Sequence, residues 1–125
     1  MFKAIIVGVA FAALATSATQ AETADTVPGS LGEFFAAYDA ATTPGHRAAL
    51  ELLVEGAKEG LMSAEAEIDA KHGTPLYCEP ANLALDPPHI IELLRIAMKD
   101  DARYGAVPVG FALLQAYKAA FPCSK

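Results

Sequence analysis

The side chains that could carry out chemistry in this chain are its three histidines and its two cysteines. His46, His72 and His89 are the candidates for a base near neutral pH. Each is expected near the end of a helix, where an exposed histidine is ordinary. The sequence has no glycine-rich phosphate loop and no histidine pair at the spacing of metal ligands. We therefore predict that the protein is not an enzyme and needs neither a cofactor nor a metal ion.

The two cysteines, Cys78 and Cys123, are expected to form one disulfide. In an exported protein a pair of thiols can oxidise and stay oxidised. A redox-active pair would more typically have Cys-x-x-Cys spacing, and a metal site would need further ligands nearby. We therefore interpret the pair as structural.

The start of the chain has the layout of a secretory signal peptide. A short basic start precedes the apolar run 4–15, and Thr19 and Ala21 suit a cleavage site. The run has about 12 residues, fewer than the roughly 20 that span a bilayer. We expect residues 1–21 to be removed, residues 22–29 to form a flexible leader, and the mature protein to be periplasmic.

The charge balance is acidic and argues against two classes of partner. The 125 residues include 15 acidic and nine Lys and Arg side chains, for a formal net charge of −6. Such a chain repels phosphate backbones and anionic lipids, so we expect neither nucleic acid nor, after signal cleavage, a membrane as partner. Glu51, Glu55 and Glu59 recur every four residues and would form one acidic ridge. The ridge is either an ordinary solvated face or a surface that steers a basic partner.

The spacing of apolar residues predicts an all-α fold, a small bundle of about four helices, and no run alternates with the period of a strand. Ser30 and Glu33 form the pattern of a capping box. Thr43 and Asp86, each followed by proline, have the pattern of an N-cap before a first-turn proline. The helices are expected from residue 31 to about 41, 44 to about 72, 87 to about 99, and about 106 to 121.

Two of the expected helices carry long apolar rows. The second would bury Leu50, Leu53, Val54, Ala57, Leu61, Ala64 and Ile68, and the fourth Val107, Phe111, Leu114, Tyr117 and Phe121. Gly56 and Gly60 would lie on one side of the second helix, which indicates close approach of another helix or a kink; we favour close approach. Gly73 would cap the end of that helix.

The third and fourth helices are similar in length and joined by a short connection, so we expect them to lie antiparallel. That arrangement would bring Cys78 beside Cys123. One disulfide would then close the open end of a C-terminal helical hairpin, and residues 30–125 would form a single helical domain.

Three short segments, with an amphipathic helix between the first two, resemble a known family: Cys78-Glu79-Pro80, Asp101-Ala102-Arg103-Tyr104 and Phe121-Pro122-Cys123. The family is the Rap/Tai family of small periplasmic immunity proteins. Residues 53–60 resemble that family's glycine-containing second helix, and the resemblance covers roughly residues 33–123. It implies that the protein neutralises a peptidoglycan amidase toxin of a type VI secretion system.

The chain departs from the family pattern on its first two helices. Many relatives carry a second cysteine pair there, where this chain has Phe34, Phe35, Leu52 and Leu53. If the family fold holds, apolar packing must replace that disulfide. Sequences of this type also occur as secreted domains without an assigned role, so the resemblance implies the fold more strongly than the activity.

Two functions stay open. The first is an immunity protein that binds and inhibits a secreted amidase; the second is a periplasmic helical binding or acid-stress chaperone-like module without a toxin partner. The irregular segment 74–85 is either a plain connector or a loop that inserts into a partner's cleft. The candidate partner-binding residues are Glu51, Glu55, Glu59, Tyr77, Glu79 and Asn82. A homodimer also stays open, because an apolar stripe can face either a core or a twin subunit.

Overall fold

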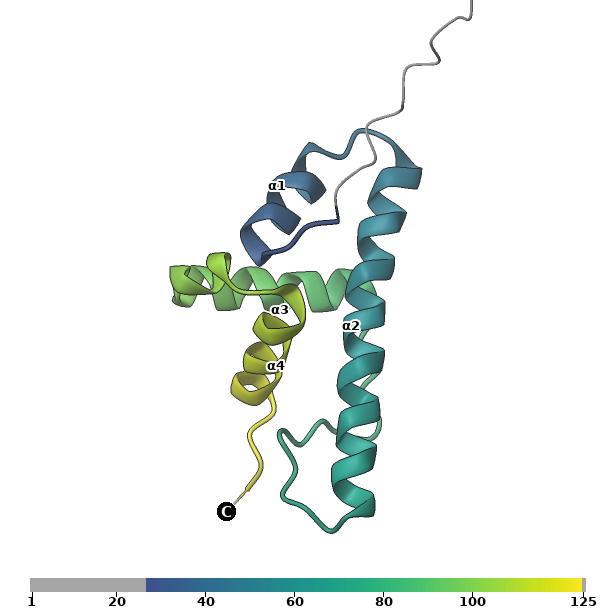
Figure 1. The fold of residues 1–125 in the computed structure, drawn as a ribbon, viewed down its shortest axis with the longest axis vertical. Coiled ribbons are helices and arrows are strands. Elements are labelled where there is room, and N and C mark those ends of the chain that lie inside the picture. The colour runs from purple at the N-terminus through teal and green to yellow at the C-terminus, as the bar shows by residue number, and fades with distance from the viewer. Residues whose placement is uncertain (1–26, 125) are drawn as a thin grey trace, which may run out of the picture.

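The computed structural model describes residues 27–124, and this part of the chain is all-α (Figure 1). The elements are α1 (Leu31–Ala40), α2 (Pro44–Ala70), α3 (Pro87–Asp100), the 3₁₀ helix η1 (Ala102–Ala106) and α4 (Val109–Ala120). No strand occurs in residues 27–124, so the expected fold class is confirmed. The expected signal peptide, residues 1–21, lies outside the described residues, as does the leader up to residue 26.

The expected starts of the first three helices are confirmed. The Ser30 hydroxyl accepts from the Glu33 N–H at 3.2 Å, and the Glu33 carboxylate accepts from the Ser30 N–H at 3.1 Å. Thr43 and Asp86 each accept from the backbone N–H three residues further on, at 3.3 and 3.1 Å. These bonds satisfy backbone donors that the first turn of a helix leaves without a partner.

The end of α2 differs from the expected glycine cap. The residue with left-handed backbone is His72, with φ 55°, and not Gly73. The His72 N–H donates to the Asp69 carbonyl at 2.9 Å and the Gly73 N–H to the Ile68 carbonyl at 2.8 Å, the hydrogen bonds of a Schellman motif. Gly73 is needed for space instead, because a Cβ there would lie 2.8 Å from Cγ2 of Ile68.

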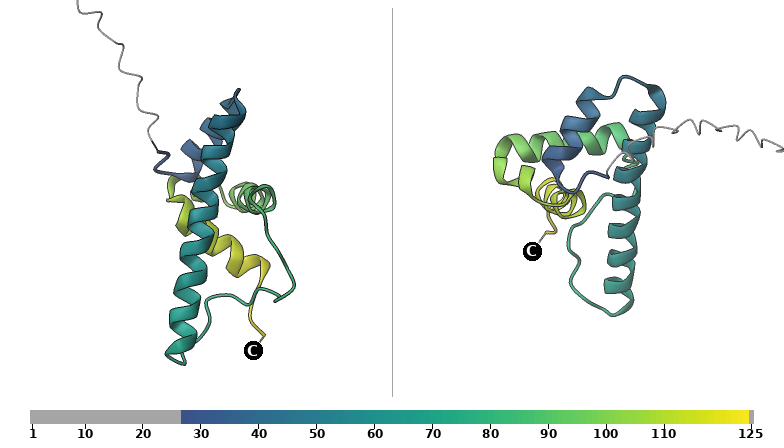
Figure 2. Two further views of the ribbon diagram at one scale, coloured as in Figure 1. Left: turned by 90° about the vertical axis from the view of Figure 1, so that its right-hand side faces the viewer. Right: turned by 45° about the horizontal axis from the view of Figure 1, so that its top comes forward.

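The longest helix, α2, runs along one side of the molecule, with α1 beside its N-terminal half (Figure 1). α3 runs across α2, and α4 packs against both. The two views of Figure 2 show α3 and α4 crossing, so the expected antiparallel alignment is wrong. The physical reason is the connection: η1 and residues 107–108 separate the two helices, and η1 packs on α1 and α3 rather than forming a tight turn.

The disulfide between Cys78 and Cys123 is confirmed, with the two Cα atoms 4.9 Å apart. It joins the loop before α3 to the chain just after α4, which are the two ends of the C-terminal helix pair. The Cys78 N–H also donates to the Phe121 carbonyl at 2.8 Å. The loop is therefore attached to the end of α4 by a covalent bond and a hydrogen bond.

All four helices contribute to one core. Its largest fully buried side chains are Leu31, Phe34, Val54, Ile90, Leu94, Leu113 and Tyr117. Phe34 and Phe35 are buried with their rings edge to face at 5.4 Å, whereas Leu52 is 70% exposed. The two aromatic residues of α1 thus belong to the core, and Leu53 of α2 packs against it.

Both long apolar rows are confirmed in part. On α2 Leu50 and Val54 are buried, Leu53, Ala57 and Leu61 pack against the core, and Ala64 is exposed. On α4 Phe111 is 49% exposed. The buried residues of α4 are Val109, Ala112, Leu113, Ala116 and Tyr117. Their spacing is helical too, and the alanines among them let α4 pack closely on its neighbours. The expected row of α4 consists of larger side chains, so it lies partly on a different face of the helix.

The close approach expected at Gly56 and Gly60 is also wrong. Both glycines are exposed, and a Cβ at either would meet nothing within 4 Å. The close approach lies at Gly32 in α1, where a Cβ would be 2.9 Å from the carbonyl oxygen of Gly105 in η1. The reason is that both glycines lie on the exposed face of α2, opposite the face on which Val54, Ala57 and Leu61 pack on the core.

Candidate binding groove

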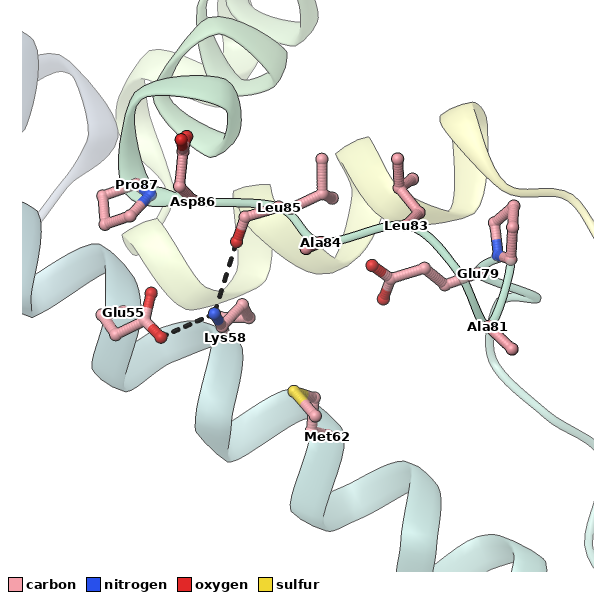
Figure 3. Close-up of a pocket in the computed structure, with 11 residues that line it drawn as sticks. Glu55, Lys58, Met62, Glu79, Ala81, Leu83, Ala84, Leu85, Asp86 and Pro87 are labelled. Atoms are coloured by element: carbon pink, nitrogen blue, oxygen red, sulfur yellow. Dashed lines mark hydrogen bonds and ion pairs between the residues drawn. The ribbon is translucent and has the colours of Figure 1, made fainter.

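A groove lies between the middle of α2 and the segment that leads into α3 (Figure 3). Its volume is about 710 Å³. Glu55, Lys58 and Met62 line it from α2, and residues 79–81 and 83–87 line it from the loop and the start of α3. One residue of the acidic ridge, Glu55, and the irregular loop therefore meet in one site.

Lys58 connects the two walls of the groove. Its Nζ lies 2.6 Å from Oε1 of Glu55 and donates to the Leu85 carbonyl at 3.4 Å (Figure 3). The Lys58 side chain is only 17% exposed, so solvent screens these contacts weakly. The lysine thereby holds the loop against α2, and its own charge is already paired.

Three polar groups of the groove and of the core have no such pairing in the described part of the chain. Oε2 of Glu55 is buried without a hydrogen-bond partner, and so is the hydroxyl of Tyr117. Glu79 is half-buried and makes no hydrogen bond or ion pair among residues 27–124. Figure 3 shows the Glu79 side chain extending from the loop toward α2, on the side of Lys58 and Met62.

The electrostatics connect the groove to the core beneath it. Burial, together with the nearby charges of Glu79 and Glu55, raises the pKa of Tyr117 far above its usual range. Burial and the charges of Glu65 and Glu79 likewise raise the pKa of Tyr77. Both phenols therefore stay protonated at neutral pH, and carboxylates of the groove lie close enough to Tyr117 to influence it.

The acidic ridge does not act as one surface. Glu51 accepts a hydrogen bond from the Tyr38 hydroxyl of α1 at 3.2 Å and is half-buried. Glu55 lines the groove and is paired with Lys58 on one oxygen. Glu59 is exposed to solvent. Three residues at one helical spacing thus have three different environments, because the neighbours of α2 change along its length.

The loop candidates also separate. Tyr77 is 6% exposed, and its ring packs edge to face on Tyr117 at 5.0 Å, so in this structure it belongs to the core and not to the surface of the loop. The residue before a disulfide cysteine is drawn into the core here because the cysteine is fixed to the end of α4. Asn82 is exposed on the loop but does not line the groove, whereas Glu79 does.

Sequence reasoning missed the apolar side chains and the lysine of the groove. Met62 is 49% and Leu83 41% exposed, and both line it. The available signals were that Met62 and Leu83 lie outside the expected core rows and that Lys58 follows Glu55 by three residues. None of these signals shows that α2 and the loop meet.

The groove lies in the most acidic part of the described chain. Residues 55–86 contain seven acidic and two basic side chains, a net charge of −5, whereas residues 87–124 contain three acidic and four basic ones, a net charge of +1. A potential of one sign along a recess attracts ions of the opposite sign.

The histidines lie at helix ends and none of them lines the groove, although His89 contacts Asp86, which does. Nδ1 of His89 is 2.6 Å from the Asp86 carboxylate at the start of α3, and His72 ends α2. Within residues 27–124 no group of three or more His, Cys, Asp or Glu side chains is placed to hold a metal ion. No helix in the same range is long and apolar enough to cross a membrane.

Comparisons of the chain with models of protein families, with curated proteins and with solved structures found no match. The resemblance to the Rap/Tai family therefore stays a prediction carried by the segments quoted for it.

Proposed function

We propose that this protein is a periplasmic immunity protein that binds and inhibits a peptidoglycan-degrading amidase toxin of a type VI secretion system. The observation that carries the proposal is the groove, in which a disulfide-attached loop and the acidic part of α2 offer carboxylates beside apolar side chains. A mixed surface of this kind is typical of a site for protein–protein contact. The resemblance to the Rap/Tai family supplies the class of partner.

Inhibition by such a protein requires contact and no chemistry of its own. The attachment of the loop to α4 lowers the conformational entropy that the loop would lose on binding. The net charge of −5 over residues 55–86 would speed encounter with a basic surface of the toxin. Glu55 and Glu79 are the partner-binding residues of this proposal, with Met62 and Leu83 as their apolar neighbours.

The experiment uses the full chain with its disulfide intact and the amidase encoded beside its gene. We expect a stoichiometric complex in size-exclusion chromatography and loss of peptidoglycan hydrolysis when the protein is added. The matched control is the same enzyme with an acidic secreted protein of similar size. An enzyme that stays free and fully active with the protein in excess would contradict the proposal.

A chaperone-like module is the second candidate, favoured by large apolar side chains that the described residues leave exposed. Leu52 is 70%, Phe111 49% and Ile96 47% exposed. A chaperone of acid stress would lose tertiary structure near pH 3 and bind varied unfolded clients. Retention of a compact fold without client binding under those conditions would exclude this candidate.

A further inference from the structure

We propose that the groove recognises a lysine or arginine side chain that a short apolar segment of the partner presents, with Glu79 and Glu55 as its acceptors. The inference rests on the proposed function for the identity of the partner, whereas the preference for a cation depends on this chain alone.

The carboxylate of Glu79 lacks a cationic partner in the described part of the chain. It is half-buried, and no cation pairs with it among residues 27–124. Partial removal of a carboxylate from water is unfavourable unless a cation or several donors replace the lost hydration. The Glu79 side chain nevertheless extends into the groove (Figure 3), where an incoming cation would compensate for the lost hydration of the carboxylate.

A second carboxylate of the lining, that of Glu55, has an oxygen without a partner among the described residues. Glu55 has Oε1 paired with Lys58, but its Oε2 is buried without a partner. The Tyr117 hydroxyl also has no partner in the described chain, but Tyr117 is fully buried and does not line the groove, so it is not an acceptor for the incoming side chain. An ammonium group brings three donors and a guanidinium group five, so one cationic side chain can serve several acceptors at once.

The apolar part of the lining suits the stem of a lysine or arginine side chain. Met62, Pro80, Leu83 and Ala84 stand beside the carboxylates. The long stems of lysine and arginine bury against apolar surface while their charged ends reach polar groups. Half-exposed Met62 and Leu83 would be covered by the stem and by an apolar neighbour on the same segment.

The charges of the groove disfavour an acidic occupant. The one lysine in the lining, Lys58, is already shared between Glu55 and the Leu85 carbonyl. The surrounding residues 55–86 have a net charge of −5. An anion would meet this field without an unpaired cation to receive it.

The test uses a short capped peptide of alternating leucine and lysine, and the same peptide with glutamate in place of lysine. Each is titrated into the isotopically labelled full chain, oxidised and at low salt. We expect the basic peptide to shift backbone resonances of residues 55–62 and 79–87 and the acidic peptide to shift none. Glu79→Gln should weaken binding of the basic peptide about tenfold, the loss of one charge-assisted hydrogen bond.

The matched control is Glu92→Gln on α3, which removes the same charge from an exposed position outside the groove. It should change the affinity less than about twofold, because only long-range attraction is altered. Equal weakening by both variants, equal binding of the acidic peptide, shifts confined to other surfaces, or no shift at millimolar peptide would each overturn the inference.

The inference and the proposed function can fail separately. A complex with the amidase that Glu79→Gln leaves unchanged would overturn the groove's role and keep the immunity function. Binding of the basic peptide at the groove, without inhibition of any neighbouring amidase, would keep the groove's preference and remove the immunity function.

Discussion

At the scale of single residues, two glycines show that one residue type can have opposite effects on the stability of the fold. Gly32 lies where α1 meets η1, and a Cβ there would be 2.9 Å from a backbone oxygen of Gly105. The neighbouring Leu31 N–H donates to the Val107 carbonyl at 2.9 Å, so the two backbones are joined at this point. Gly56 lies on an exposed face of α2, and a Cβ added there would meet no atom within 4 Å.

Alanine at these two positions should therefore have opposite effects. Gly32→Ala is expected to lower the free energy of unfolding by about 1–3 kcal/mol, because the backbone of η1 must move to admit the methyl group. Gly56→Ala should raise it by about 0.5–1 kcal/mol, because alanine has the higher helix propensity. Urea denaturation of both variants measures the difference, and a change of the same sign in both would contradict this account.

At the scale of elements, the loop between α2 and α3 has few attachments for its length. Residues 71–86 contain no helix. The loop is held by the disulfide of Cys78, by buried Tyr77, by the Leu76 N–H to Glu65 at 2.8 Å, and by Lys58 at Leu85. The disulfide is the strongest of these attachments, and the groove depends on it because Glu79 follows Cys78 directly.

Replacement of both cysteines by serine should destabilise the protein by about 4 kcal/mol, the chain-entropy estimate for a bridge that spans 45 residues. Hydrogen exchange should increase most in residues 71–86, because α3 and α4 keep their apolar contacts. A reducing agent should act on the native chain in the same way and leave the double variant unchanged. Uniform exchange across all four helices would argue against a local role of the bridge.

At the scale of the whole molecule, three aspartates make the fold sensitive to acid. The Arg95 side chain, through its hydrogen bond, lowers the pKa of Asp39 and ties α3 to α1. The His89 N–H lowers the pKa of Asp86 at the start of α3. The Arg103 side chain lowers the pKa of Asp101 at the start of η1. Each ionised carboxylate is stabilised more in the folded than in the unfolded chain.

The sign of the pH dependence follows from these shifts. Because the folded-state pKa values lie below the ordinary value of 3.8, the stabilisation is complete above that pH and is lost as the pH falls through the lowered values. Thermal unfolding between about pH 6 and about pH 2 should show constant stability and then a decline. Asp39→Asn should be less stable near neutral pH and decline less steeply. Identical pH profiles for the variant and the native chain would contradict this assignment.

The positions of helix starts are the features best predicted from the sequence. The caps at Ser30, Thr43 and Asp86 are confirmed because each depends on residues at most three positions apart. The pairing of Cys78 with Cys123 is also confirmed, since the chain has no third cysteine. The candidate site was predicted in part: Glu55 and Glu79 line the groove, whereas Tyr77 is buried and Asn82 lies outside the lining.

The amino-acid sequence alone determined the all-α class, the caps and the disulfide, because capping, helical periodicity and cysteine pairing follow from local spacing and residue counts. Only the tertiary structure decided which face of α4 is buried, where α1 touches η1, and that Glu79 and Glu55 line the same groove. These are contacts between segments far apart in the chain. Their geometry depends on how four helices share one core, and no single segment contains that information.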